Sequence, residues 1–158
     1  MSKARVSVLI LAALFTFNGC RKADPPLNAG ETPCGFLNGP EVAEFQGVMT
    51  EVGWLYGFHL KYKADREFVL GQLATMPVDA SAPSDVGPGD TQPIPIDKAE
   101  ALDRMTPAPA EFSSLGSWNP EQVQDGTSYG FFRFPWQHTL LFDSATGTVY
   151  HYITEVRP

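Results

Sequence analysis

The side chains best suited to chemistry in this sequence are three histidines and two cysteines. The histidines are His59, His138 and His151, and the cysteines are Cys20 and Cys34. There is no CxxC pair and no Cys/His spacing of a zinc site, and the motifs of common hydrolases and phosphate-binding loops are absent. Because a catalytic triad is defined by geometry and not by sequence order, these absences leave an enzyme open.

The relation between His138 and His151 depends on how two predicted strands pair. Residues 143–147 (DSATG) between them have the composition of a hairpin turn. If the turn pairs Phe142 with Thr148, the two histidines point to opposite sides of the sheet and cannot share a metal ion. A slip of one residue reverses that conclusion. We therefore predict no metal site at the histidines and no other cofactor.

The same pairing predicts an aromatic-rich face of the sheet. Its candidate binding residues are Trp136, His138, Tyr150 and Tyr152. One interpretation is a cleft in which His138 contacts a ligand. The other is an ordinary sheet core with a hydrogen-bonded histidine at its edge, since aromatic side chains dominate core burial in any case. The second is favoured.

The remaining candidates for catalysis are weaker. Asp97, Glu100 and Asp103 have helical spacing, but charges on a short helix are typical of a solvated face. Cys34 is predicted to be an incidental thiol near the N-terminus, with an intermolecular disulfide or a nucleophile as the alternatives. No residue is assigned a catalytic role.

The strands and helices predicted around these residues indicate an α+β domain. Residues 48–62 alternate with period two, so their even positions are predicted to face the core and His59 the solvent, with a bend at Gly53 or Gly57. Three further strands are predicted at 129–134, 137–142 and 148–154.

Short helices are predicted to accompany this sheet. One follows a cap at Asp65, a second runs from a capping box at Asp97 to residue 105, and a single turn starts at Asn119. We therefore expect one antiparallel sheet of four or five strands, with two or three short helices packed on one face. Residues 77–97 contain five prolines and are expected to form a long loop.

The N-terminus carries an export signal. Lys3 and Arg5 precede a short apolar run at 6–17, which is followed by a small residue and Cys20. This segment resembles the lipobox signal of bacterial lipoproteins. The resemblance implies cleavage before Cys20, acylation of that cysteine, and attachment to the outer membrane facing the periplasm.

The expected domains follow from this signal. Residues 1–19 form the signal peptide, residues 20–40 a lipidated flexible tether rich in proline, and residues 41–158 a single α+β domain. The mature chain would carry 9 basic and 18 acidic residues, a net charge of −9. Such a charge disfavours nucleic acid and suits a basic protein partner, but it is also a common route to solubility, which is the favoured interpretation.

The function predicted from these observations is that of a membrane-tethered binding module of the cell envelope, with an immunity or inhibitor protein as one form of it. A hydrolase is an alternative, using Cys34 or one of three serines (Ser113, Ser114, Ser117) as nucleophile and His138 as base. A mainly structural or assembly lipoprotein is the third interpretation.

Overall fold

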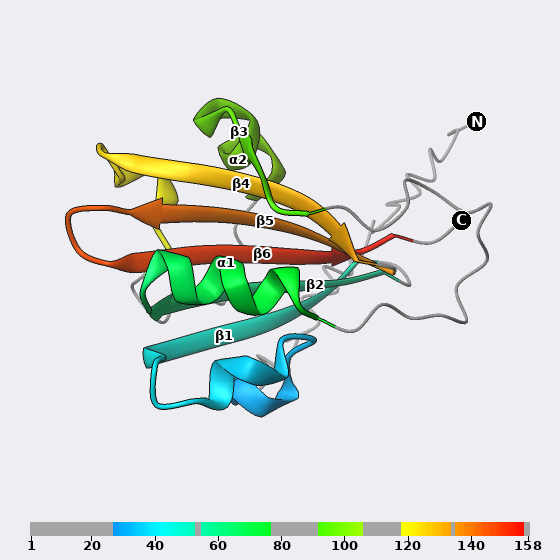
Figure 1. Cartoon of the computed structure of the whole chain (residues 1–158). Coiled ribbons are helices and arrows are strands. Elements are labelled where there is room, and N and C mark those ends of the chain that lie inside the picture. The colour runs from blue at the N-terminus through cyan, green and yellow to red at the C-terminus, as the bar shows by residue number, and fades with distance from the viewer. Residues whose placement is uncertain (1–26, 53–54, 77–91, 106–117, 134, 157–158) are drawn as a thin grey trace, which may run out of the picture.

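A six-stranded antiparallel sheet organises the part of the chain that the computed structural model describes, which is residues 27–52, 55–76, 92–105, 118–133 and 135–156 (Figure 1). The strand order is β1-β2-β6-β5-β4-β3. The strands are β1 (Ala43–Val52), β2 (Leu55–Lys63), β3 (Ile94–Ile96), β4 (Gly126–Arg133), β5 (Trp136–Asp143) and β6 (Thr148–Glu155). The helices are α1 (Arg66–Ala74) and α2 (Lys98–Met105), with single 3-10 turns at η1 (Ala29–Glu31), η2 (Gly35–Asn38) and η3 (Pro120–Gln122).

The predicted α+β class is confirmed, but the sheet has six strands where four or five were expected. The alternating segment forms two strands, because Val52 pairs with Leu55 and the chain reverses between them. Gly57 lies within β2 and does not interrupt the strand, while Gly53 lies outside the described residues. The additional strand, β3, falls in the proline-rich range 77–97, of which residues 77–91 are also outside the described part.

Helical segments cover both faces of the sheet, so the prediction that they share one face is wrong. Figure 1 shows α1 lying across the middle strands, and its buried residues Val69 and Leu73 pack with Leu140 of β5. The buried Met105 of α2 packs instead with Leu141, the next residue along β5. Because successive side chains of a strand point to opposite faces, α1 and α2 lie on opposite sides.

The described part of the expected tether belongs to the domain. The N-terminal segment, which we define as residues 27–42, contains η1 and η2 and packs on the same face as α1. Leu37 is 2% exposed, and the Leu27 N–H donates to the Gly47 carbonyl over 3.0 Å. In the described part, Gly30 lies in η1 and Pro40 in a turn after η2, and apolar side chains of this segment pack on the sheet.

The helix caps and the turn glycine predicted from the sequence are present in the structure. The Asp65 carboxylate caps α1 by accepting from the backbone N–H groups of Glu67 and Phe68. Asp97 accepts from the Ala99 N–H at the start of α2, and Gly147 has the positive φ of 68° expected in the hairpin turn. None of the described helices is long and apolar enough to cross a bilayer.

Two glycines should respond in opposite directions to alanine. At Gly126 an added Cβ would lie 2.5 Å from the Phe142 carbonyl oxygen, so Gly126→Ala is expected to destabilise the fold by about 1–3 kcal/mol. At Gly71, in α1, an added Cβ meets nothing within 4 Å, and Gly71→Ala is expected to stabilise by about 0.5–1 kcal/mol. Urea unfolding of both variants checks this pair, and equal effects would contradict the close strand approach at Gly126.

Candidate functional site

The β5–β6 hairpin pairs one residue away from the predicted register. Asp143 pairs with Thr148, and the Gly147 N–H donates to the Asp143 carbonyl over 2.9 Å, which closes the turn over residues 144–147. His138 therefore lies opposite Ile153, and His151 opposite Leu140. The two histidines share one face of the sheet, so the prediction that they point to opposite faces is wrong.

The register also separates the four predicted binding residues. Trp136 and His138 lie on the face covered by α1, where the Trp136 ring meets the Phe58 ring at 5.5 Å between centroids. Tyr150 and Tyr152 lie on the opposite face, where the Tyr150 hydroxyl donates to Asn119 Oδ1 over 2.8 Å. The structure does not bring these four side chains together as one aromatic site.

A buried polar cluster forms instead on the α1 face. We call Cys34, Tyr62, His138 and His151 the His–Cys cluster. His138 Nδ1 lies 3.0 Å from His151 Nε2, and His151 Nδ1 lies 3.2 Å from the Tyr62 hydroxyl. Cys34, from the N-terminal segment, completes the cluster, since a ligand atom of each of Cys34, His138 and His151 lies within 4.8 Å of the other two. All four side chains are at most 1% exposed.

Burial keeps every member of the cluster neutral. Desolvation lowers the pKa of His151 to about 3. Desolvation, then the neighbouring His151 and Arg133, lowers the pKa of His138 well below its usual value. The same burial raises the pKa values of the Cys34 thiol and the Tyr62 phenol. At neutral pH the cluster is therefore an uncharged hydrogen-bonded chain inside an apolar core.

This chain of hydrogen bonds ends on an unsatisfied atom. His138 Nε2 is buried and has no hydrogen-bond partner among the described residues. The ring of His138 stacks on Phe131 with 4.3 Å between centroids, and the charge of the buried Arg133 also acts on it. Leaving a buried polar atom without a hydrogen bond costs about 1–3 kcal/mol of stability. The unpaired nitrogen of His138 is therefore an unusual feature of this core.

The cluster is poorly suited to the predicted hydrolase. Cys34 lies within 4.8 Å of His138, and it is buried in the core and not in the tail where the sequence placed it. A reactive cysteine, however, needs an accessible thiolate, whereas Cys34 is fully buried with a raised pKa. The serines proposed as alternatives, Ser113, Ser114 and Ser117, lie outside the described residues.

His59 is also buried, although the sequence placed it on a solvent-leaning face. It is 3% exposed and lies on the α2 face, where its ring is 5.1 Å from the Trp118 ring and 4.6 Å from the Tyr152 ring. Desolvation lowers the pKa of His59 to about 4, partly opposed by a backbone hydrogen bond at Met105. The three histidines therefore divide into a pair on one face and a single residue on the other.

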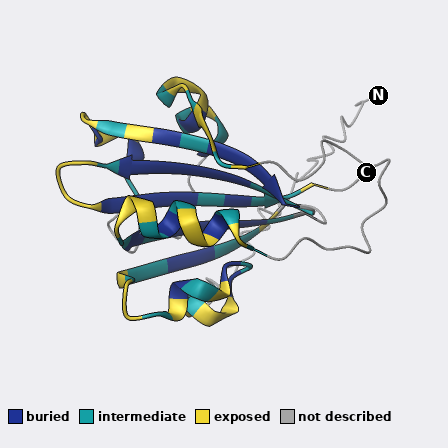
Figure 2. Ribbon diagram, viewed as in Figure 1, coloured by how far each residue is buried: buried dark blue, intermediate teal, exposed yellow. Residues whose placement is uncertain are grey.

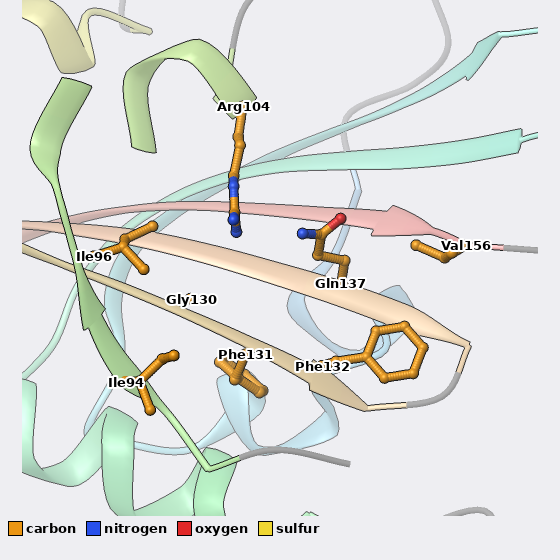
Figure 3. Close-up of a pocket in the computed structure, with 8 residues that line it drawn as sticks. All are labelled: Ile94, Ile96, Arg104, Gly130, Phe131, Phe132, Gln137 and Val156. Carbon is orange, nitrogen blue, oxygen red and sulfur yellow. The ribbon is translucent and has the colours of Figure 1, made fainter. Parts of the chain in front are cut away.

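An open pocket of about 290 Å³ lies on the α2 side at one end of the sheet (Figure 3). It is lined by Ile94, Ile96, Arg104, Gly130, Phe131, Phe132, Gln137 and Val156. Figure 3 shows the Arg104 side chain reaching from α2 toward the strands. Gly130 leaves the room for it, because a Cβ there would lie 3.1 Å from Arg104 Nη1.

The predicted carboxylates lie on the outer side of α2. Asp97, which precedes α2, and Glu100 and Asp103 within it are all exposed. Figure 2 shows exposed positions along α2, as expected of a solvated helix face. Glu100 pairs with Arg104 at 2.5 Å, which ties one carboxylate to the rim of the pocket. The pocket could not be predicted from the sequence, because β3, whose two isoleucines form one wall, lies in a range expected to be a loop.

Comparison with family models, curated proteins and solved structures found no match to this chain.

Proposed function

We propose that this chain is a lipid-anchored binding protein of the bacterial cell envelope, which holds a protein partner through the pocket between β3, β4 and α2. The anchor is Cys20, attached to the outer membrane on its periplasmic side. An immunity or inhibitor protein is the form of this function that an acidic, tethered domain suits best.

The observation that carries the proposal is an apolar pocket with exposed apolar residues at its rim. Ile94 is 56% exposed and Val156 is 36% exposed, and these are the large exposed apolar side chains of the described residues. Both line the pocket. A concave apolar site with a few polar groups is typical of an anchor point for one side chain of a partner.

Charge favours a basic partner around that anchor. Asp97, just before α2, and Glu100 and Asp103 within it are exposed, and Glu100 pairs with Arg104, which lines the pocket. Rim charges of one sign raise the rate of association with a partner of the opposite sign. The partner is therefore expected to insert an apolar side chain and to surround it with basic groups.

Site-specific photo-crosslinking tests this proposal in cells that express the full chain. A photoreactive phenylalanine analogue at Ile94 is expected to give one defined adduct, identified by mass spectrometry. The same analogue at Glu121, which is exposed on η3 and is not among the residues lining the pocket, serves as the control position.

A substitution that fills the pocket tests whether the crosslink at Ile94 depends on the pocket. Gly130→Val places side-chain atoms among Ile96 and Arg104, so it is expected to reduce the Ile94 adduct about tenfold or more. Gly71→Val changes an open helix position far from the pocket lining and should leave the adduct unchanged. An adduct that survives Gly130→Val, or equal adducts from Ile94 and Glu121, would show that the pocket does not bind the partner.

A further inference from the structure

The His–Cys cluster has the composition of a metal site. Two imidazoles and one thiol converge from β5, β6 and the N-terminal segment, with ligand atoms within 4.8 Å of one another. Imidazole and thiolate together are the ligands of zinc and copper, and a trigonal set of two histidines and one cysteine is a known copper arrangement. We infer that Cys34, His138 and His151 bind one copper(I) ion.

The hydrogen bonds around the cluster prepare the nitrogens for this role. The Tyr62 hydroxyl engages His151 Nδ1 and so leaves His151 Nε2 facing His138. Such an outer contact fixes the orientation of a ligating imidazole. His138 faces His151 through Nδ1, so Nδ1 is the nitrogen that would bind the ion, and the ring proton would then lie on the buried Nε2, which has no hydrogen-bond partner among the described residues.

The distances require only small movements. Metal–nitrogen bonds of about 2.0 Å and metal–sulfur bonds of about 2.3 Å put trigonal ligand atoms about 3.5–3.7 Å apart. His138 Nδ1 and His151 Nε2 are now 3.0 Å apart, and the whole set lies within 4.8 Å. Shifts of about an ångström bring the set to binding geometry without a change of strand register.

The net charge of the bound metal and its thiolate favours copper(I) over zinc(II). On binding, the Cys34 S–H bond breaks, its proton leaves to solvent, and the sulfur keeps the electron pair for the metal. A thiolate with copper(I) is neutral overall, whereas a thiolate with zinc(II) keeps one positive charge. The surrounding core contains Leu140, Ile153 and Phe131, and the buried, positively charged Arg133 also acts on His138, so an additional positive charge there is costly. Three protein ligands also satisfy copper(I), while a closed zinc site takes four.

Copper loading of the full chain tests the site. The chain is refolded from urea in detergent with one equivalent of copper(I) under reducing conditions, so that the closed core does not prevent entry. It is then dialysed against a copper(I) chelator. We expect one copper per chain, with one sulfur and two nitrogens around it by X-ray absorption spectroscopy.

Variants identify the ligands. Cys34→Ala keeps a small apolar side chain in the core and is expected to weaken copper(I) binding by more than about 100-fold, beyond the 10–100-fold typical of outer contacts. Cys20→Ala and His59→Phe remove a cysteine and a buried histidine outside the cluster, and both should retain the ion. Circular dichroism checks that each variant is folded.

Several results would overturn the assignment. The wild-type chain could lose all copper to the chelator, or bind it without sulfur. Cys34→Ala could bind as tightly as the wild type, or Cys20→Ala could lose the ion. The spectrum of the wild-type chain decides the matter even where a variant fails to fold.

Discussion

Acidification from pH 7 to pH 5 is expected to remove a large part of the stability of this fold. His59, His138 and His151 are buried and neutral, with pKa values lowered by desolvation, to about 4 for His59 and about 3 for His151. In the unfolded chain each titrates near 6.5. The unfolded state therefore binds more protons below pH 6.5, so the stabilising contribution is complete above that pH and is lost as the pH falls toward the folded-state pKa values.

The size of the effect follows from the number of protons. Each histidine contributes about 1.4 kcal/mol per pH unit in this window, so three contribute about 4 kcal/mol per unit. Between pH 6.5 and 5 this amounts to about 6 kcal/mol, which compares with about 5–15 kcal/mol for the whole stability of a typical domain.

Urea unfolding at half-unit pH intervals measures this slope. His59→Phe replaces a histidine already enclosed by the rings of Trp118 and Tyr152, and it should lower the slope by about one third. A free energy of unfolding that stays constant between pH 7 and pH 5 would contradict the burial of the three neutral histidines.

Leu37→Ala is expected to cost about 2–5 kcal/mol, as for other fully buried leucines. Leu37 lies in η2 of the N-terminal segment, is 2% exposed, and belongs to the same core as Leu60, Leu73 and Leu140. A leucine in a flexible tether would contribute nothing, so the substitution separates a packed segment from a linker.

Asn38→Ala, at the exposed neighbouring position, is the control and should change stability by less than about 0.5 kcal/mol. Thermal and urea unfolding of the two variants give the comparison. Equal, near-zero effects at Leu37 and Asn38 would restore the interpretation of this segment as a tether.

Much of the local structure could be predicted, because it depends on neighbours in the sequence. The cap at Asp65, the single turn after Asn119 and the positive φ of Gly147 each follow from one residue's own chemistry. The even positions of β2, Phe58, Leu60 and Tyr62, face the core as their alternation indicated.

The register of the pairing between β5 and β6 could not be predicted in the same way. The composition of residues 143–147 specifies a turn, but it does not specify whether Phe142 or Asp143 pairs with Thr148. A shift of one residue moves His151 to the other face of the sheet, and the His–Cys cluster depends on that shift.

Two other elements escaped prediction because their composition favours loops. Pro95 lies inside β3, where proline is tolerated because this strand is at the edge of the sheet and pairs with β4 alone. Cys34 lies among the turn residues of the N-terminal segment, and nothing local in the sequence shows that these turns pack against β2, β5 and β6. Both the pocket and the cluster therefore depend on contacts between segments far apart in the chain.

Nitrogen NMR of the histidine-labelled protein at pH 7 measures whether His138 and His151 meet inside the core. A scalar coupling is expected between His138 Nδ1 and His151 Nε2, transmitted through the hydrogen bond that joins them over 3.0 Å. Two neutral rings with no coupling, each exchanging its ring proton freely with solvent, would place the histidines apart and would contradict the register on which the cluster rests.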